Sequence, residues 1–347
     1  MKAWYTLLLL LYAPFSAAQL NLTDSIRLSG FGTVSAAKVD TQTPVIGNRE
    51  ITEDWCFDCD TTLGLQLDVD FTDLWRASAQ VVKRPQDEFS SPELEQAFVE
   101  YANNNYQIKV GRLRLPLYMY SEVYYVSSAY PWLRLPIDVY SFDLGITHFD
   151  GARLDWNVDL SDEVQLIITP FYTSSSNSTQ VLYGLESHIE TGHSGGISSQ
   201  IYYNENEFKL TYIRTDLTLT APQPIGTSQY NIDLLTLGMS YYLDLLHFQT
   251  EILFADDFDA NWYAGLDYPL GDWQPYIQYG QQRSNLKSES YLIGTKYNIT
   301  RQLNLNVEWQ YIVGRKEMIN SHFTELQMTS SYEHSANIVS IGMSFTF

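Results

Sequence analysis

Polar and apolar side chains alternate along most of this chain, and this period of two restricts its possible folds more than any other feature. The segment 302–313 is the cleanest example, with one face formed by Leu303, Leu305, Val307, Trp309, Tyr311 and Val313 and the other by Asn304, Asn306, Glu308 and Gln310. The segments 63–71, 246–254 and 262–268 repeat the pattern. No convincing period of 3.6 residues occurs after residue 25, so the sequence predicts an all-β fold.

The lengths of the predicted strands and of their links distinguish a membrane barrel from a soluble sandwich, which also alternates. Strands of about 9–11 residues suit a tilted wall that spans a bilayer. The links after even-numbered strands are tight and most links after odd-numbered strands are long, as expected of periplasmic turns and outer loops. We therefore predict a transmembrane antiparallel β-barrel of about sixteen strands, near 25–38, 61–71, 74–84, 92–102, 105–114, 146–159, 163–173, 194–204, 207–219, 229–243, 245–257, 259–268, 272–283, 288–299, 302–316 and 335–347.

Both ends of the chain fit this prediction. Residues 1–18 have a positively charged start, an apolar centre and a small-residue cleavage site, which together predict a removable export signal. Residues 19–347 then form a single transmembrane β-barrel, and we expect it in the cell outer membrane. Its last strand carries Phe345 and Phe347 on one apolar face, and we expect this strand to close the barrel against the first one.

The composition argues against some partners and favours others. The chain has 41 acidic and 20 basic residues and a net charge of −21, so nucleic acid is not an expected partner, because phosphates need a basic face. Its 26 tyrosines and 8 tryptophans exceed the needs of a soluble core. Both residue types favour the interface between membrane and water, which again indicates a lipid environment.

One long stretch between the fifth and sixth predicted strands breaks the alternation. The sequence 111–141 has neither a two-residue nor a helical period, and Pro116, Pro131 and Pro136 exclude a regular ladder through it. A long ordered insertion is usually functional, and the many tyrosines of this one argue against disorder. We expect the segment 115–145 to be a third outer loop that folds into the lumen and sets what passes.

This order of features resembles that of Gram-negative porins. The resemblance rests on the export signal, the opening IRLSGFGTVSA at 26–36, the sixteen predicted strands, the terminal Phe347 and the loop elements GRLRLP, YSE, YPW and RLP, which are similar to a gammaproteobacterial group of porins. It implies a channel for passive diffusion of small hydrophilic solutes or ions, a third loop that narrows the barrel, and a homotrimer. Two departures are a C-x-x-C in the first outer loop and the lack of a coiled coil before the first strand.

Charged side chains in the lumen would set the selectivity of such a channel. Strict alternation along the fifth strand points Arg112 and Arg114 at lipid, where an arginine at the bilayer midplane costs about 2–4 kcal/mol. Either a bulge at Gly111 shifts the register, or the chain leaves the wall there and turns inward. Both alternatives place the two arginines in the lumen, near Arg76 and Arg84.

The loop itself carries charges of both signs. We expect Arg134 to join the basic wall, and Glu122, Asp138 and Asp143 to face it across the constriction. Opposed charges of this kind produce a transverse field that small polar solutes can follow. The alternative is that the arginines only brace the loop through carboxylates. The sequence decides neither the solute nor a preference for anions or cations.

The first outer loop contains both cysteines of the chain, Cys56 and Cys59, and we predict a small disulfide between them, as befits an exported protein. A metal site would need further ligands, and no histidine lies in this segment, so we expect neither a metal nor a cofactor. The acidic residues of the same loop form either a solvated surface or a site for divalent cations shared with lipopolysaccharide. Outer-membrane lipid, lipopolysaccharide and the barrel-assembly machinery are the expected macromolecular partners.

Two other functions compete with the channel. A barrel enzyme of the lipase or protease type needs a nucleophile and a base within reach of each other. The six histidines are scattered along the sequence and no nucleophile motif accompanies them, so we do not expect an enzyme. An adhesin or assembly barrel would use its loops and leave the pore incidental. A hydrolysis assay and a liposome-swelling assay separate these alternatives from a channel.

Overall fold

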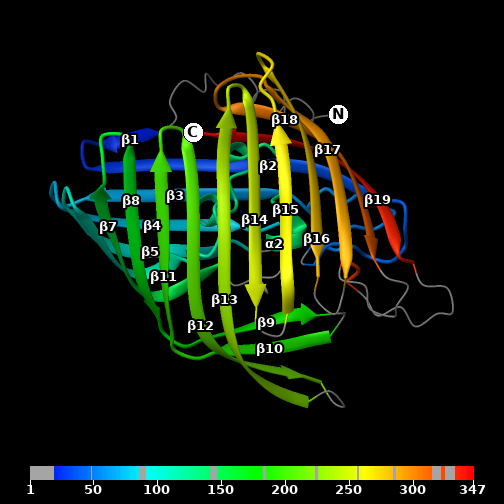
Figure 1. The fold of residues 1–347 in the computed structure, drawn as a ribbon, viewed down its shortest axis with the longest axis horizontal. Helices are drawn as coiled ribbons and strands as arrows, with labels where there is room; N and C mark the ends of the chain where they lie inside the picture. Colours follow the sequence, from blue (N-terminus) through cyan, green and yellow to red (C-terminus); the bar gives the residue numbers. More distant parts are fainter. Residues whose placement is uncertain are drawn as a thin grey trace, which may run out of the picture.

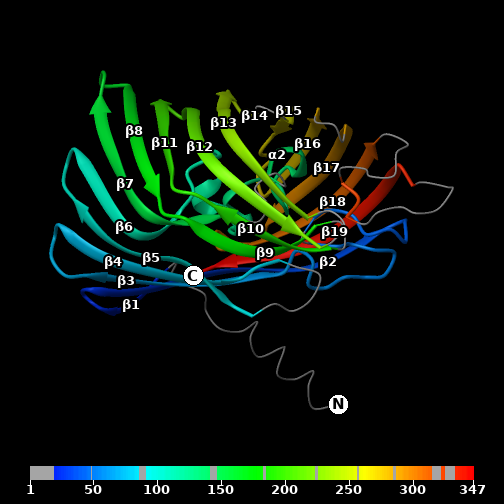
Figure 2. The ribbon, with the colours of Figure 1, turned by 90° about the horizontal axis from the view of Figure 1, so that it is seen from below.

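The computed structural model describes residues 19–347 except residue 48 and the segments 86–90, 141–146, 183–184, 223–225, 256–257, 284–286, 315–321 and 325–332. The predicted export signal at 1–18 and the predicted site residue Asp143 lie outside the described residues. The strands of the described part pair into one antiparallel sheet, which curves into a barrel (Figures 1 and 2).

The sheet contains strands β1 (Leu20–Thr23), β2 (Ile26–Val39), β3 (Thr62–Asp70), β4 (Trp75–Lys83), β5 (Glu93–Ala102), β6 (Tyr106–Arg114), β7 (His148–Asp159), β8 (Val164–Thr173), β9 (Ser176–Leu182), β10 (Leu185–Thr191), β11 (Ser194–Tyr203), β12 (Asn206–Ala221), β13 (Gly226–Leu243), β14 (Leu246–Ala255), β15 (Phe258–Asp267), β16 (Trp273–Gln282), β17 (Ser288–Asn298), β18 (Leu303–Gly314) and β19 (Ser335–Thr346). Sixteen of them form the wall. The other three are β1, a short strand that pairs antiparallel with the start of β2, and β9 and β10, which form a hairpin between β8 and β11.

The wall is closed by its first and last members. β19 pairs with β2 along the register from Ile338 opposite Val39 to Thr346 opposite Phe31. Phe347 and Gly30 then exchange two backbone hydrogen bonds of 2.9 Å. Elsewhere consecutive wall strands pair, and β8 pairs directly with β11. The predicted all-β antiparallel barrel of about sixteen strands is confirmed, and so is its closure by the C-terminal strand.

The two faces of the wall differ as the alternation requires. The outward face is apolar and exposed, for example at Val34, Leu63, Leu65, Leu67, Val99, Ile108, Val110, Leu210, Leu237, Ile277, Ile293, Val307 and Ile341. The opposite face carries buried polar groups such as Ser78, Gln80, Glu100, Lys209, Thr236, Gln249, Glu251, Lys296, Asn306, Glu308 and Ser340. An apolar exterior around a polar interior is the arrangement of a membrane barrel.

The links divide the barrel into two ends. At one end, which we call the short-turn end, the wall strands are joined by 71–74, 103–105, 160–163, 204–205, 244–245, 268–272 and 299–302. Aromatic rings gather there on the outward side, with the centroids of Trp75 and Tyr101 5.1 Å apart and those of Trp273 and Tyr297 4.6 Å apart. The other end, the long-loop end, carries the links 40–61, 84–92, 115–147 and 315–334.

The structure adds to the sequence prediction between β8 and β11. Residues 174–193 are expected as a loop but contain the hairpin of β9 and β10, which prolongs β8 and β11 past the end of the wall. The strands of the hairpin pair through backbone hydrogen bonds, which do not require an apolar face. Their largely polar sequence therefore shows little alternation of polar and apolar residues. The hairpin also pairs with β12, from His188 opposite Thr220 to Thr191 opposite Leu217.

The third long link is the part of the fold that matters most for the site. Its described residues form the short helices η1 (Ser121–Val123), η2 (Ser127–Ala129) and α2 (Ile137–Tyr140). None of the helices in the described part of the chain is both long and apolar enough to cross a membrane. Figures 1 and 2 show α2 surrounded by strands, and it contacts β14, β15 and β16.

Candidate functional site

The third loop, residues 115–140, packs against the inward face of the wall through its large apolar side chains. Trp132 is buried, and its ring centroid lies 5.6 Å from that of Tyr263 on β15. Glycines of the wall make room for side chains of the loop. A Cβ added at Gly238 would lie 2.4 Å from Met119, one at Gly265 3.0 Å from Trp132, one at Gly280 1.8 Å from Asp138, and one at Gly342 2.2 Å from Leu133. The wall and the loop are therefore complementary in shape.

Polar side chains of the wall form hydrogen bonds with the backbone of the third loop. Lys209 donates to the carbonyl of Tyr118 at 2.6 Å and Thr236 to that of Leu117 at 2.6 Å. The same pattern continues with Thr211 to Pro116 (3.1 Å), Lys296 to Ser128 and Tyr130 (2.8 Å each), Asn306 to Pro131 (2.7 Å), and the amides of Met119 and Leu133 to Glu251 (2.8 Å) and Glu308 (2.7 Å). Buried backbone groups need such partners, so the inward side chains of five strands fix the loop.

Arg134 anchors the loop to the first outer loop. Its guanidinium donates to both carboxylate oxygens of Asp60, at 3.1 and 2.6 Å, and to Gln310 at 3.1 Å. Arg49 donates to the same carboxylate at 2.7 Å. Burial alone would raise the pKa of Asp60, but the attraction of Arg134 and Arg49 outweighs it and lowers that pKa to about 2.

Arg84 and Arg114, two predicted lumen residues, share one buried acid. Arg114 donates to Glu95 at 2.7 Å and to Gln80 at 2.9 Å, and its guanidinium lies 4.8 Å from the ring centre of Tyr125. Arg84 donates to the other oxygen of Glu95. Glu95 is not among the site residues predicted from the sequence, although the adjacent polar residues Glu95 and Gln96 interrupt the alternation of this strand. The pairing of β5 with β4 shifts register at this point.

The prediction that Arg112 lines the lumen is wrong. The register runs unshifted through Gly111, with Val110 opposite Val99 and Arg112 opposite Ala97, so Arg112 stays on the outward face. It donates to both oxygens of Asp150, at 2.8 and 3.0 Å, and to the carbonyl of Leu94 at 3.1 Å. The free-energy cost of an outward-facing arginine is reduced here because its charge is paired with that of Asp150, and the cost expected from the sequence assumes an unpaired arginine.

Gly111 itself explains why the ladder continues. Its φ of 134° is a conformation that residues with a side chain rarely adopt, and an added Cβ would lie 2.3 Å from the carbonyl oxygen of Ala97. Glycine thus lets β6 twist here without leaving β5. The pairing of β6 with β5 ends at Arg112, but its pairing with β7 continues to Arg114 opposite His148, so the chain leaves the wall only after Arg114.

Arg76 and Glu122 belong to a row of acids and bases along the wall that reaches the third loop. Arg76 donates to Glu100 at 2.7 Å, and Lys109 lies 3.4 Å from Glu100 and 3.6 Å from Asp155. Arg153 donates to Asp155 at 3.1 Å and also to Glu122 of the loop. Glu122 therefore faces a basic wall residue as expected, but its partner is Arg153 and not Arg76 or Arg84.

Asp138 is a buried point of contact between the third loop and other parts of the barrel. It is buried in α2, accepts a hydrogen bond from Ser290 of β17, and lies 3.3 Å from Nε2 of His322 in the last long link. The side chain thus joins the third loop to the wall and to a second loop at the long-loop end. Its place beside Gly280 leaves no room for a wall side chain.

The two cysteines of the first outer loop are joined by a disulfide. Cys59 is fully buried in an apolar cluster that includes Ile137 of the third loop and Phe323 of the last long link. Of the acids beside it, Asp58 pairs with Lys83 and Asp60 pairs with Arg134. These two acids are buried ion-pair partners, and so they do not belong to a solvated acidic surface.

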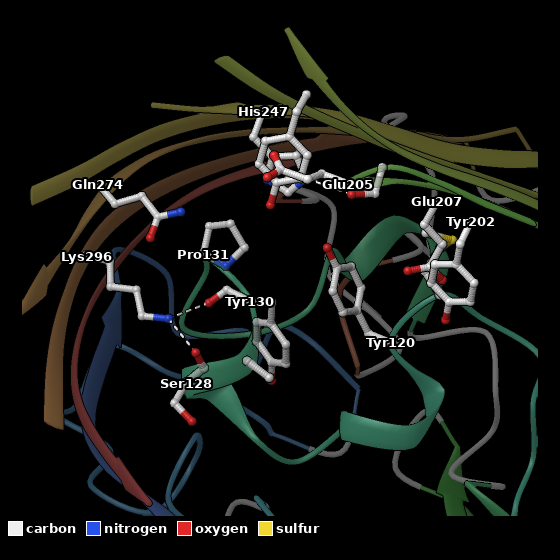
Figure 3. Close-up of a pocket in the computed structure, with 14 residues that line it drawn as sticks. Tyr120, Ser128, Tyr130, Pro131, Tyr202, Glu205, Glu207, His247, Gln274 and Lys296 are labelled. Carbon is white, nitrogen blue, oxygen red and sulfur yellow. Dashed lines mark hydrogen bonds between the residues drawn. The ribbon is translucent and has the colours of Figure 1, made fainter. Parts of the chain in front are cut away.

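A cavity of about 340 Å³ lies between the third loop and the short-turn end of the wall. Figure 3 shows the carboxylates of Glu205 and Glu207 with the ring of Tyr202 on one side, and Lys296 and Gln274 on the other. The rings of Tyr120 and Tyr130 come from the loop. This cavity could not be predicted from the sequence, because its lining residues lie on six separate strands, the turn 204–205 and the third loop.

Ser240 and His247 line this cavity, and together with Asp267 they have the order of a hydrolase triad. Ser240 Oγ lies 2.7 Å from Nε2 of His247, and Nδ1 of His247 lies 2.9 Å from Asp267. A hydrolase also needs donors for the oxyanion. β13 is paired on both sides, so the backbone amides around Ser240 belong to its ladders and offer no such site. The arrangement fits a hydrogen-bonded wall, in which Asp267 also accepts from Gln249 and Gln274.

The closed wall, apolar outside and polar inside, with a loop fixed to its inner face, defines the class of an outer-membrane β-barrel channel. The family model of Gram-negative porins matches residues 6–316, and the chain belongs to this family. The protein is therefore an outer-membrane porin, as the sequence predicts. A search of curated protein sequences gives no match.

Solved structures share the fold at low sequence identity. The anion-selective porin from Comamonas acidovorans is 13% identical, with a TM-score of 0.60 over 93% of this chain and 99% of that one. The outer membrane channel DcaP of Acinetobacter baumannii is 14% identical, with a TM-score of 0.60 over 93% and 97%. OmpF of Salmonella typhi, solved in complex with daunomycin, is 13% identical, with a TM-score of 0.56 over 95% and 100%. Identities of this size show a common fold only.

Proposed function

We propose that this porin is a passive-diffusion channel for small hydrophilic solutes or ions, in which the third loop forms the constriction. The observation that carries the proposal is the set of hydrogen bonds between inward side chains of β12, β13, β14, β17 and β18 and the backbone of residues 116–133. A segment held by side chains that point into the barrel occupies part of its cross-section, so it reduces the width of the water path.

We propose further that the ion pairs at the loop edge set selectivity. Glu122 is half exposed beside the nearly buried Arg153, and Arg76 is also partly exposed beside Glu100. Charges that reach water from a constricted wall act on passing ions. Arg84 and Arg114 are more deeply buried against Glu95 and act through the net charge of that cluster. The edge charges Glu122 and Arg76 are the stronger candidates for direct contact with ions.

The test is electrical. Purified protein in a planar bilayer is expected to give discrete conductance steps in KCl, and loaded liposomes are expected to swell in small sugars. Deletion of residues 118–132 should raise the step size while the barrel stays folded. Absence of steps and of swelling from folded protein would exclude the channel and leave the adhesin or assembly alternative.

The proposal includes the absence of catalysis. The family and the fold favour a channel, and the triad-like residues lack donors for an oxyanion. Purified protein should hydrolyse p-nitrophenyl acetate no faster than its Ser240→Ala variant. A rate that depends on Ser240 would overturn this point without affecting the channel.

Membership of the porin family supports further proposals on the export, assembly and oligomeric state of the protein. We propose an export signal at 1–18, a homotrimer, contact with lipopolysaccharide at the long-loop end, and insertion by the assembly machinery through the strand that ends in Phe345 and Phe347. The pairing of Phe347 with Gly30 supports a closing role for that strand. Amino-terminal sequencing of the exported protein and chemical cross-linking test the first two points.

A further inference from the structure

The cavity at the short-turn end has more aromatic surface than a simple water path needs. Tyr120 and Tyr130 of the loop lie with their ring centroids 5.7 Å apart, and Tyr202 and Tyr242 line the cavity from β11 and β13. Tyr242 stacks on His247 with a centroid separation of 4.1 Å. Tyrosine rings carry a negative π-face that attracts cations.

The charge that this cavity offers to a solute is negative. Glu205 lies exposed in the turn 204–205, and no residue of the described chain pairs with its carboxylate. Glu207 points inward beside Gln200, which donates to it. Both carboxylates lie on the side of the cavity that carries Tyr202 (Figure 3).

The nearby lysines are committed to other partners. Lys296 lines the opposite side, and its ammonium donates to the carbonyls of Ser128 and Tyr130 at 2.8 Å each (Figure 3). Lys209 is buried and donates to Tyr118. Both ammonium groups hold the loop, so the carboxylates dominate the field on the Tyr202 side of the cavity.

We propose that this cavity is a binding site for small organic cations, namely ammonium-bearing solutes with an apolar body, and this rests on the proposed channel function. The ammonium group lies between Glu205 and Glu207 and against the ring of Tyr202, and the apolar body contacts Tyr120 and Pro131. A volume of about 340 Å³ is in the range of small-molecule sites. A neutral sugar lacks the charge that the carboxylates attract, and a carboxylic acid is repelled.

The experiment measures block of KCl conductance in planar bilayers, with choline as the probe and glucose and acetate as neutral and anionic comparisons. Choline is expected to reduce the conductance with a saturating dependence on concentration, and glucose and acetate are not. The half-blocking choline concentration should rise about five- to tenfold in Glu207→Gln and in Tyr202→Leu, the change expected from one lost ionic or cation–π contact.

Matched controls lie next to the tested residues. Glu163→Gln removes a carboxylate from another short turn, and Tyr203→Leu removes an exposed ring from the outward face. Both should leave choline block unchanged. If Glu207→Gln does not insert, Glu205→Gln in the exposed turn gives the same comparison.

The outcomes separate the site from the channel. Normal KCl conductance without choline block, or with block that is insensitive to Glu207 and Tyr202, overturns the binding site and leaves the channel intact. Block by acetate or glucose to the same extent as by choline overturns the assignment to cations. Folded protein without conductance overturns the channel, and the binding site with it.

Discussion

Arg134 of the third loop and Asp60 of the first loop form a two-point ion pair, with nitrogen–oxygen distances of 3.1 and 2.6 Å and both side chains almost fully buried. The pair joins two loops that are 74 residues apart in sequence. Gln310 and Ser340 of the wall accept further hydrogen bonds from the same guanidinium. One arginine thus connects the third loop, the first outer loop and the barrel wall.

Substitution Arg134→Gln should release this connection. Loss of one partner of a buried ion pair typically costs about 3–5 kcal/mol, because the remaining charge is left buried. Since the rest of the wall is unaffected, we expect a folded barrel with larger and noisier conductance steps and faster protease cleavage within 40–61. Arg214→Gln is the control, since Arg214 is largely exposed and its guanidinium lies as far as 4.0 Å from the carboxylate of Asp233. Equal behaviour of the two variants would show that Arg134 does not fix the loop.

The same pair predicts a dependence on pH. The pKa of Asp60 is lowered to about 2 from an ordinary 3.8, so its stabilisation of the loops is fully present above about pH 4 and is lost as pH falls towards 2. A shift of this size corresponds to roughly 2 kcal/mol. Conductance noise should therefore be constant from pH 6 to pH 4 and increase below about pH 3. In Asp60→Asn the noise should already be high at neutral pH and should lack this acid transition.

Much of the fold could be predicted because the alternation is a local property of the sequence. Each of the sixteen predicted segments overlaps a wall strand, for example 302–316 with β18 (Leu303–Gly314). The hairpin of β9 and β10 was missed because its strands lie beyond the wall, where no apolar face is required. Pairing of this kind depends on backbone groups that every sequence offers.

The site was less predictable because ion pairs depend on register between distant segments. Arg112 is expected in the lumen because an unpaired arginine on the lipid face is costly, yet Asp150 lies directly opposite on β7 and pairs with it. Asp60 resembled its exposed acidic neighbours, and only the folded loop places it against Arg134. The aromatic content of the third loop, by contrast, is a local signal, and it correctly marked the segment as ordered.

The different positions of Arg112 and Arg114 give a direct comparison. Arg114→Ala removes one of the two arginines around buried Glu95, so the local charge becomes more negative and the reversal potential should shift towards cation preference. Arg112→Ala lies on the outward face and should leave selectivity and conductance unchanged. Reversal potentials in a KCl gradient measure both. A shift in the Arg112 variant equal to that in the Arg114 variant would contradict the outward placement.

The disulfide between Cys56 and Cys59 should stabilise the first loop locally. A closed loop of this length contributes about 2 kcal/mol in the chain-entropy model. Replacing both cysteines by serine should increase protease cleavage within 40–61, because Cys59 packs in the cluster that contains Ile137. The barrel should remain folded, as judged by circular dichroism. Treatment of the unmodified protein with a reductant should reproduce the effect, and treatment of the double variant should add nothing.

Glu122 provides a test with the opposite sign. Its carboxylate accepts a hydrogen bond from Arg153, whose guanidinium also donates to Asp155 at 3.1 Å. Glu122→Gln removes one of these two negative charges at the loop edge, where the side chain is half exposed. The remaining charge is more positive, so the reversal potential should shift towards anions, opposite to Arg114→Ala. Asp162→Asn is the control and should cause no shift, because Asp162 is exposed in the turn 160–163 at the short-turn end. If Glu122→Gln and Arg114→Ala shift selectivity in the same direction, the charges act by moving the loop and not through their field.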